Sequence, residues 1–331
     1  MKRKLVLMIL PFFLLAALSA CQGEAETNKT VIKMTNPPQS TDIPMAPDQP
    51  TAEQPTEEPK ATTTPAAPSE TGDTGVPVSD ASPILMPVPP FSYYISDAAR
   101  AAAADQAETS AFKLTMTFSE PNKITDTDEW FTNNQLSLNP TGETSPGEIN
   151  SFTTAYGDGT YFYQINGIDY SGGTFLNIYG TDSDKLLYSL DFSNYLYSPE
   201  YKEEDYNFIQ QKIKCAAIQD NILYVSHSHS TYAESSNNMN AYITAIDLSD
   251  MSILWKSDAL VCNSMSFVIV NDVIICGYGF TAEPDYLYQI DCNTGKVLDK
   301  TPLKTAPEYI IKKDSVLYVR TYDMDYQFLL Q

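Results

Sequence analysis

A two-part unit of apolar runs and polar turns recurs along the second half of the chain, and it restricts the fold more than any other feature. Its longer part reads YITAIDLSDMSILW from Tyr242 and YLYQIDCNTGKVLD from Tyr286, with a degenerate copy, FLNIYGTDSDKLLY, from Phe175. Asp247 and Asp291 occupy equivalent positions in the first two copies and are 44 residues apart. Such spacing indicates one supersecondary unit that is repeated several times.

A shorter part precedes each copy and consists of an Asp or Asn turn followed by an apolar strand. Runs of Tyr, Ile, Val, Thr and Phe alternate with turn residues, and helical periodicity is scarce. Four short strands in a period of about 40 to 45 residues are typical of a propeller blade, so we expect an all-β fold, a β-propeller. The shorter part reads QDNILYVSH from Gln219, VNDVIICGY from Val270, KKDSVLYVR from Lys312 and, more weakly, YGDGTYFYQ from Tyr156.

Individual positions of the unit have mechanical roles. Residues 293–296 form an Asn-Thr-Gly-Lys hairpin turn, in which Gly295 adopts a positive φ without steric cost. We expect Ile246 and Ile290 to fill the blade cores. Trp255 ends its strand, and a large aromatic side chain at that place packs against the next blade.

The unit resembles the quinoprotein-like, or PQQ-like, repeat, whose core ends with a Thr-Gly-Lys turn and an apolar strand closed by Trp. The match is best at 243–255 and 287–298, partial at 175–188, and covers about 150 residues in all. Only one copy has the Trp, and only one has the full turn. A lipoprotein that assists outer-membrane protein assembly carries the same repeat, which implies an assembly scaffold by analogy.

The resemblance also raises the question of an enzyme, because quinoprotein dehydrogenases share this repeat. In that family the quinone cofactor lies on a Trp, beside calcium and a disulfide between adjacent cysteines. This chain has only Trp130 and Trp255, and no two cysteines are adjacent. We therefore expect no cofactor and no dehydrogenase activity. A nucleophile elbow, a phosphate loop and a catalytic His with an orienting acid are also missing from the sequence, so we expect a protein that is not an enzyme.

Division of residues 91–331 by the length of a blade predicts about five blades, with the possibility of a partial ring. The last unit, at 307–330, lacks its outer strand. Residues 112–118, FKLTMTF, are expected to supply this strand and remove an exposed edge; the alternative is an open propeller that a partner completes. An Ala-rich helix at 96–108, capped by Ser96 or Asp97, leads into the domain. The other units are expected at 151–191, 214–257 and 262–300.

The N-terminus has the layout of a secretory signal, with three basic residues before an apolar stretch that is too short for a membrane span. The stretch ends in Leu-Ser-Ala-Cys, which resembles the bacterial lipobox. We therefore expect residues 1–20 to be a lipoprotein signal peptide and Cys21 to carry a lipid anchor to the membrane. Cleavage removes three basic and no acidic residues and changes the net charge from −22 to −25. This charge argues against nucleic acid as a partner.

Residues 21–90 are rich in Pro and Thr and contain 14 of the 22 prolines of the chain. A segment with so few apolar groups is expected to be a disordered tether. Stretched toward polyproline II it would reach roughly 200 Å, the scale of a thick cell wall. We expect an extracytoplasmic protein anchored at a Gram-positive surface; an outer membrane is the alternative.

Few residues are candidates for a metal site. His227 and His229 lie on one face of a strand, a spacing that suits two metal ligands, but no third ligand is indicated. We therefore interpret them as a solvated strand end. The acidic turns DTDE at 126–129 and DSD at 182–184 lack the spacing of an EF-type calcium site.

Four cysteines follow Cys21, and buried thiols in strands are the simplest interpretation. The alternative is a single disulfide bond between two of these cysteines. If the hairpin between them turns near Pro284, Cys276 and Cys292 face each other across two strands.

The connections between the two parts of each unit vary in length, so we expect a ligand to be selected there. Tyr232, Tyr278 and Phe280 are large side chains in otherwise polar loops, and they are our candidate binding residues; the alternative is that they cap the blade cores. We expect a scaffold that binds an envelope protein or a cell-surface glycan. The alternative function is an extracytoplasmic sensor or a carbohydrate-binding module.

Overall fold

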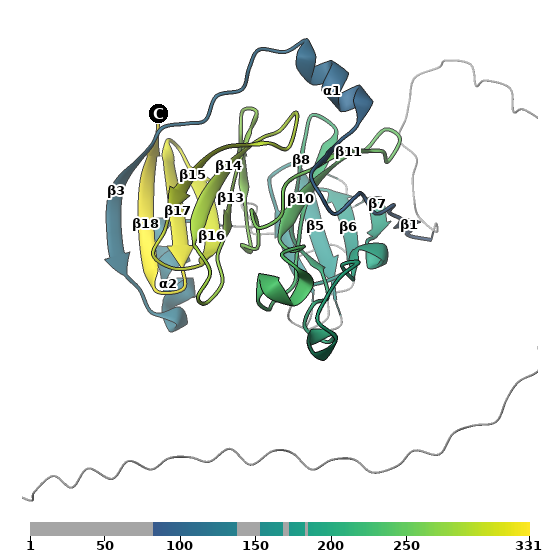
Figure 1. The fold of residues 1–331 in the computed structure, drawn as a ribbon. Coiled ribbons are helices and arrows are strands. Elements are labelled where there is room, and N and C mark those ends of the chain that lie inside the picture. The colour runs from purple at the N-terminus through teal and green to yellow at the C-terminus, as the bar shows by residue number, and fades with distance from the viewer. Residues whose placement is uncertain (1–81, 138–152, 168–171, 183–184) are drawn as a thin grey trace, which may run out of the picture. The chain divides into compact units, whose positions relative to one another are not determined.

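The computed structural model describes residues 82–137, 153–167, 172–182 and 185–331, and their structure is almost entirely β. In this part of the chain, no helix is long and apolar enough to span a membrane. The strands form four sheets (Figure 1). Sheet 1 contains β4 (Thr154–Gly157), β5 (Tyr161–Asn166), β6 (Phe175–Gly180) and β7 (Leu186–Asp191); sheet 2 contains β8 (Lys212–Gln219), β9 (Ile222–Ser228), β10 (Tyr242–Asp247) and β11 (Ile253–Lys256).

Sheets 3 and 4 continue the same pattern along the chain. Sheet 3 contains β12 (Val268–Val270), β13 (Val273–Tyr278), β14 (Tyr286–Asp291) and β15 (Val297–Pro302); sheet 4 contains β16 (Pro307–Lys313), β17 (Val316–Thr321) and β18 (Met324–Leu330). Within every sheet, strands that follow one another in sequence pair antiparallel. The four units expected from the sequence therefore correspond to the four sheets, each with the strand order of a propeller blade.

The first strands of the four sheets converge. Side chains from β4, β8 and β16, with Phe267 and Val268 at the start of β12, line one pocket of about 320 Å³. Hydrogen bonds join successive sheets: the Tyr156 hydroxyl donates to the Ala216 carbonyl at 2.9 Å, and the Ser266 hydroxyl donates to the Ile310 carbonyl at 3.0 Å. This convergence of inner strands is the arrangement of a β-propeller.

The segment 84–121, which we call the N-terminal strap, runs along the outer edges of these sheets. It contains β1 (Ile84–Leu85), which pairs with β7, and β2 (Tyr94–Ile95), which pairs with β11. The strap then forms α1 (Asp97–Ala104), whose N-cap is Ser96 as expected, and β3 (Leu114–Pro121). Because β1 and the buried Met86 belong to the fold, the domain extends N-terminal of the boundary expected at residue 90.

Strand β3 is the outer strand of sheet 4 and pairs antiparallel with β18, from Leu114 opposite Leu330 to Pro121 opposite Met324. Figure 1 shows it beside β18. The prediction that residues 112–118 supply the missing strand is confirmed. The expectation of about five blades is not confirmed, because the described residues form four sheets. Strands β1, β2 and β3 of the strap join the edges of three of these sheets and form no further sheet in the described residues. Two short elements follow, η1 (Ile124–Asp126) and α2 (Thr127–Asn134).

The roles expected for the repeat positions are confirmed. Gly295 has a φ of +73°, and Ile246 and Ile290 are fully buried. Trp255 is also fully buried, and its indole N–H donates at 2.7 Å to the carbonyl of Cys292, the residue that follows β14 of sheet 3. The Trp at the end of a strand therefore ties sheet 2 to the next sheet.

Candidate functional site

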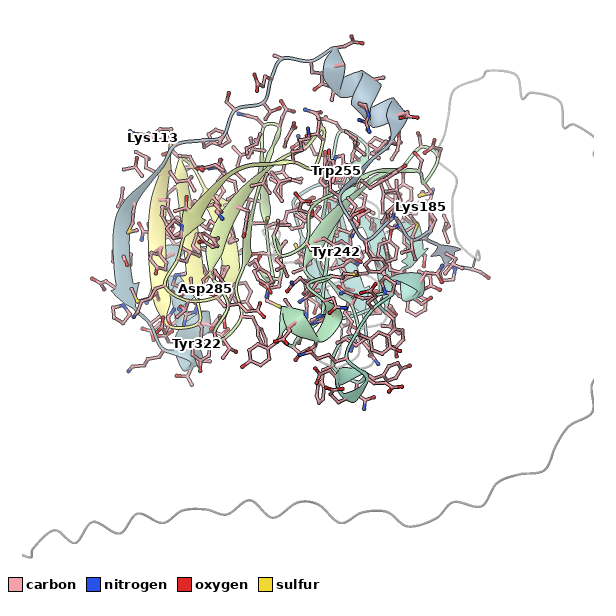
Figure 2. The ribbon with its side chains drawn as sticks, in the orientation of Figure 1. Lys113, Lys185, Tyr242, Trp255, Asp285 and Tyr322 are labelled. Atoms are coloured by element: carbon pink, nitrogen blue, oxygen red, sulfur yellow. The ribbon has the colours of Figure 1, made fainter. Side chains whose placement is uncertain are left out.

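The connections at the two ends of the sheets differ in length. At one end the turns are tight, as at Asp220 and Asn221, which both adopt positive φ between β8 and β9. At the other end the loops after β7, β9 and β13 span many more residues. Figure 2 shows Asp285 and Tyr322, from the β13–β14 and β17–β18 connections, at the same end, and Trp255 and Lys113 toward the opposite one.

An ion pair and hydrogen bonds connect three of the long loops. Lys202, in the β7–β8 loop beside η3 (Glu203–Asp205), pairs with Glu234 of the β9–β10 loop at 2.6 Å. The next loop is tied in by the Ala233 backbone N–H in η4 (Ala233–Ser236), which donates to the Glu283 carboxylate at 2.8 Å. We call these three loops, residues 192–211, 229–241 and 279–285, the loop face.

Aromatic side chains gather on the loop face and on the neighbouring β17–β18 turn. Seven Phe or Tyr side chains are exposed in the described residues, and only Phe118 and Phe175 lie in strands. The tight turns at the other end carry no exposed Phe or Tyr among their described residues. Exposed aromatic groups of this kind are the anchors that protein partners use most. The five on this end are Tyr201, Tyr206, Phe208, Tyr232 and Tyr322.

The candidate binding residues divide into two kinds. The rings of Tyr232 and Phe280 pack edge to face, with centroids 5.1 Å apart, and Tyr232 is 46% exposed. Tyr278 is instead buried at the end of β13, and its hydroxyl donates to Glu283. Burial raises the pKa of the Tyr278 hydroxyl above its ordinary value. Tyr278 therefore belongs to the core, as the alternative interpretation expected, and it is not the loop side chain that the sequence indicated.

A pocket of about 420 Å³ opens beside Phe280. The Asn263 amide nitrogen donates to the Gly279 carbonyl, and the Gly279 N–H donates to the Asn263 amide oxygen. These two hydrogen bonds fix the Asn263 side chain in the wall of the pocket. Ser228 is fully buried, and its hydroxyl has no hydrogen-bond partner in the described residues. Burial raises the pKa of Glu308 at the pocket rim. The walls are mainly apolar: Ile124, Met265, Phe280, Ala306, Pro307 and Tyr309.

Both histidines are buried, so the interpretation as a solvated strand end is wrong. The His227 ring stacks on Tyr195 with centroids 4.6 Å apart, and the centroid of the Tyr242 ring lies 5.5 Å away. Neither ring nitrogen of His227 has a hydrogen-bond partner among the described residues. His229 is satisfied, because its Nε2 lies 2.7 Å from the Ser236 hydroxyl. Tyr195 of the β7–β8 loop and Tyr242 of the neighbouring strand β10 cover this strand end.

Burial lowers the pKa of His227 to about 3, and the nearby Lys256 ammonium adds to the shift. Between pH 6.5 and 3 the unfolded chain therefore binds a proton that the native chain does not, and native stability falls as the pH falls. We expect His227→Phe to raise the free energy of unfolding by about 1 kcal/mol at pH 7, because no buried polar atom is left unpaired. The gain should grow toward pH 4 in urea melts.

The matched control for this prediction is His229→Phe, which removes the hydrogen bond to Ser236 and should destabilise the protein at pH 7. A loss of stability in the His227→Phe variant that stays constant between pH 7 and pH 4 would show that the imidazole has a partner or that the larger ring does not fit.

The structure corrects the proposed disulfide. Cys276 is opposite Tyr288, and Cys292 lies beyond the end of β14. The hairpin is centred two residues earlier than Pro284, which shifts the register. Cys276 lies instead next to Cys262, and burial raises the pKa of the Cys276 thiol. The thiols of Cys215, Cys262, Cys276 and Cys292 are all buried and free.

Among the described residues, the candidates named from the sequence are not arranged to hold a metal ion or a quinone cofactor. No group of three or more His, Cys, Asp or Glu in the described ranges is arranged to hold a metal ion. The segment 126–129 is not a turn but the junction of η1 and α2, where Asp126 pairs with the buried Arg320; the 182–184 turn lies partly outside the described residues. Trp255 is enclosed, and Trp130 is buried beside the Arg320 guanidinium. Neither indole therefore presents a free face to a flat cofactor.

Comparisons with known proteins do not identify a family. No protein-family model matches the sequence, and no curated protein matches it. Solved structures to which the chain is similar include BamB from Moraxella catarrhalis (9% identity, 56% of this chain and 61% of that chain, TM-score 0.31). Others are Sqt1 from Saccharomyces cerevisiae (10%, 52% and 42%, 0.35) and a Bacteroides ovatus protein described as xyloglucan PUL GH43B (13%, 57% and 40%, 0.35). This chain thus spans less than two thirds of their lengths.

Proposed function

We propose that this protein is a surface scaffold that binds a protein partner through the loop face. The observation that carries the proposal is the concentration of exposed aromatic side chains on hydrogen-bonded loops at one end of the sheets, while the other end has tight turns. Interlocked loops lose little conformational freedom on binding, which favours affinity. In this proposal the protein is a scaffold and not an enzyme.

The proposed location is the outer side of a bacterial membrane, where a lipid anchor would hold the domain at the surface. 

The lipid anchor on Cys21 is proposed from the lipobox-like sequence, and Cys21 lies outside the described residues. Labelling of the wild-type chain with a fatty-acid analogue, compared with Cys21→Ala, tests the anchor separately from the binding function.

The test of binding is capture from the native envelope with the full chain as bait. We expect Tyr232→Ser combined with Phe280→Ser to reduce the recovered partner at least tenfold, because two hot-spot aromatic residues contribute about 2 kcal/mol or more each to an interface. The melting midpoint should stay within a few degrees of the wild type, since Tyr232 is exposed and Phe280 is only partly buried.

The matched control is Phe118→Ser, which removes an exposed ring from β3, away from the loop face. This variant should recover as much partner as the wild type. Equal recovery with the Tyr232/Phe280 variant would place the binding surface elsewhere. Material that is resistant to protease and sensitive to glycosidase would favour the carbohydrate-binding function instead.

A further inference from the structure

Three tyrosines of the β7–β8 loop form a cluster of rings that faces solvent. Tyr197 and Tyr206 stack in parallel, with planes 10° and centroids 4.8 Å apart. The Tyr201 ring is tilted by 49° against Tyr206 at 5.8 Å. Tyr201 and Tyr206 are 38% and 43% exposed, and the nearby Phe208 is 62% exposed. We call these four residues the tyrosine platform.

Carboxylates accompany the platform and leave it strongly negative. Residues 197–208 contain Glu200, Glu203, Glu204 and Asp205 but a single basic residue, Lys202. Lys202 is already paired with a glutamate of the next loop. Glu203 and Glu204 are both exposed.

The loop that carries the platform is fixed in place before any partner binds. The Lys202 backbone N–H donates to the Ser235 carbonyl at 2.8 Å, and the Ser235 hydroxyl donates to the Asp205 carboxylate at 2.6 Å. The Gln211 backbone N–H closes the loop on the Leu196 carbonyl at 2.7 Å. The rings are thus held in a stacked arrangement by the loops around them.

The face of an aromatic ring carries partial negative charge, and cations bind it at distances below about 6 Å. Carboxylates beside the rings add to this attraction, whereas a neutral sugar gains no charge–charge attraction from them and an anionic one is repelled. We infer that the tyrosine platform binds Lys or Arg side chains in a basic segment of a protein partner. The inference rests on the proposed function, since it specifies the chemistry of the partner.

The probe for the test is an eight-residue peptide of alternating Gly and Lys, titrated into the full chain by calorimetry at 150 mM salt. The same peptide with acetylated lysines keeps the length and loses the charge. We expect the acetylated peptide to bind at least tenfold more weakly. Tyr201→Ser combined with Tyr206→Ser should weaken binding of the basic peptide at least tenfold, and the control Tyr322→Ser should leave it unchanged.

A second variant tests the contribution of the carboxylates to peptide binding without disturbing the fold. Glu203→Gln combined with Glu204→Gln changes two exposed side chains and should weaken binding severalfold without a change in melting midpoint. Equal affinity for both peptides would overturn the inference. An unchanged affinity of the Tyr201/Tyr206 variant for the basic peptide would overturn it too, because the peptide would then be attracted to the acidic surface in general and not bound by the rings. If that variant still captures the envelope partner, the platform is not its binding site, while the scaffold function stands.

Discussion

Removal of β3 is expected to abolish the cooperative unfolding of the domain. A chain that begins at Thr153 lacks the whole strap, so β18 becomes an unpaired edge and the cluster around Leu317, Val319 and Phe328 loses its cover from Phe112 and Leu114. Exposed apolar edges also promote association. The melting midpoint should fall by more than about 10 °C, or the transition should broaden until no single midpoint is defined.

The control for this experiment is a chain that begins at Ser82 and keeps the strap. It should melt like the full chain, because β1, the first described strand, begins at Ile84. Calorimetry and near-UV circular dichroism measure both chains. A chain starting at Thr153 that melts as cooperatively as the control would show that β3 contributes little to sheet 4.

The repeat made much of the fold predictable. Asp and Asn turns, the glycine turn at Gly295 and the terminal Trp255 are local signals, and each one lies where the sequence placed it. The pairing of β3 was also predictable, because the last unit lacked one strand. Strands β1 and β2 were not predictable, since two-residue strands have no periodicity and exist only through their tertiary partners.

The candidate site was harder to predict because its features depend on contacts between distant loops. The polar surroundings of His227 in the sequence gave no sign that Tyr195 and Tyr242 enclose it. Tyr278 and Phe280 are two residues apart, yet one is core and the other lines a pocket. The tyrosine platform was missed, although the run YSPEYKEEDYNF, residues 197–208, places four aromatic residues in an acidic loop.

Trp255→Ala is expected to be the most damaging single substitution. The side chain is fully buried, and its loss leaves a cavity between sheets 2 and 3 and removes the hydrogen bond to the Cys292 carbonyl. The free energy of unfolding should fall by about 3–5 kcal/mol, and the melting midpoint by about 6 to 20 °C. Trp255→Phe keeps part of the packing and should cost less. A loss below 1 kcal/mol for the Ala variant would mean that the sheets are not joined here.

A double-mutant cycle with Gly295 tests the same junction from the other side. A methyl group at Gly295 would lie 2.4 Å from Cε3 of Trp255, and the residue also has a positive φ. Gly295→Ala in the wild type therefore suffers both a clash and backbone strain, whereas in the Trp255→Ala background only the strain of about 1 kcal/mol remains. We expect the second substitution to cost at least 1 kcal/mol less in that background. Additive losses in urea melts would show that the turn and the Trp do not touch, and the tie between sheets 2 and 3 would then rest on other contacts.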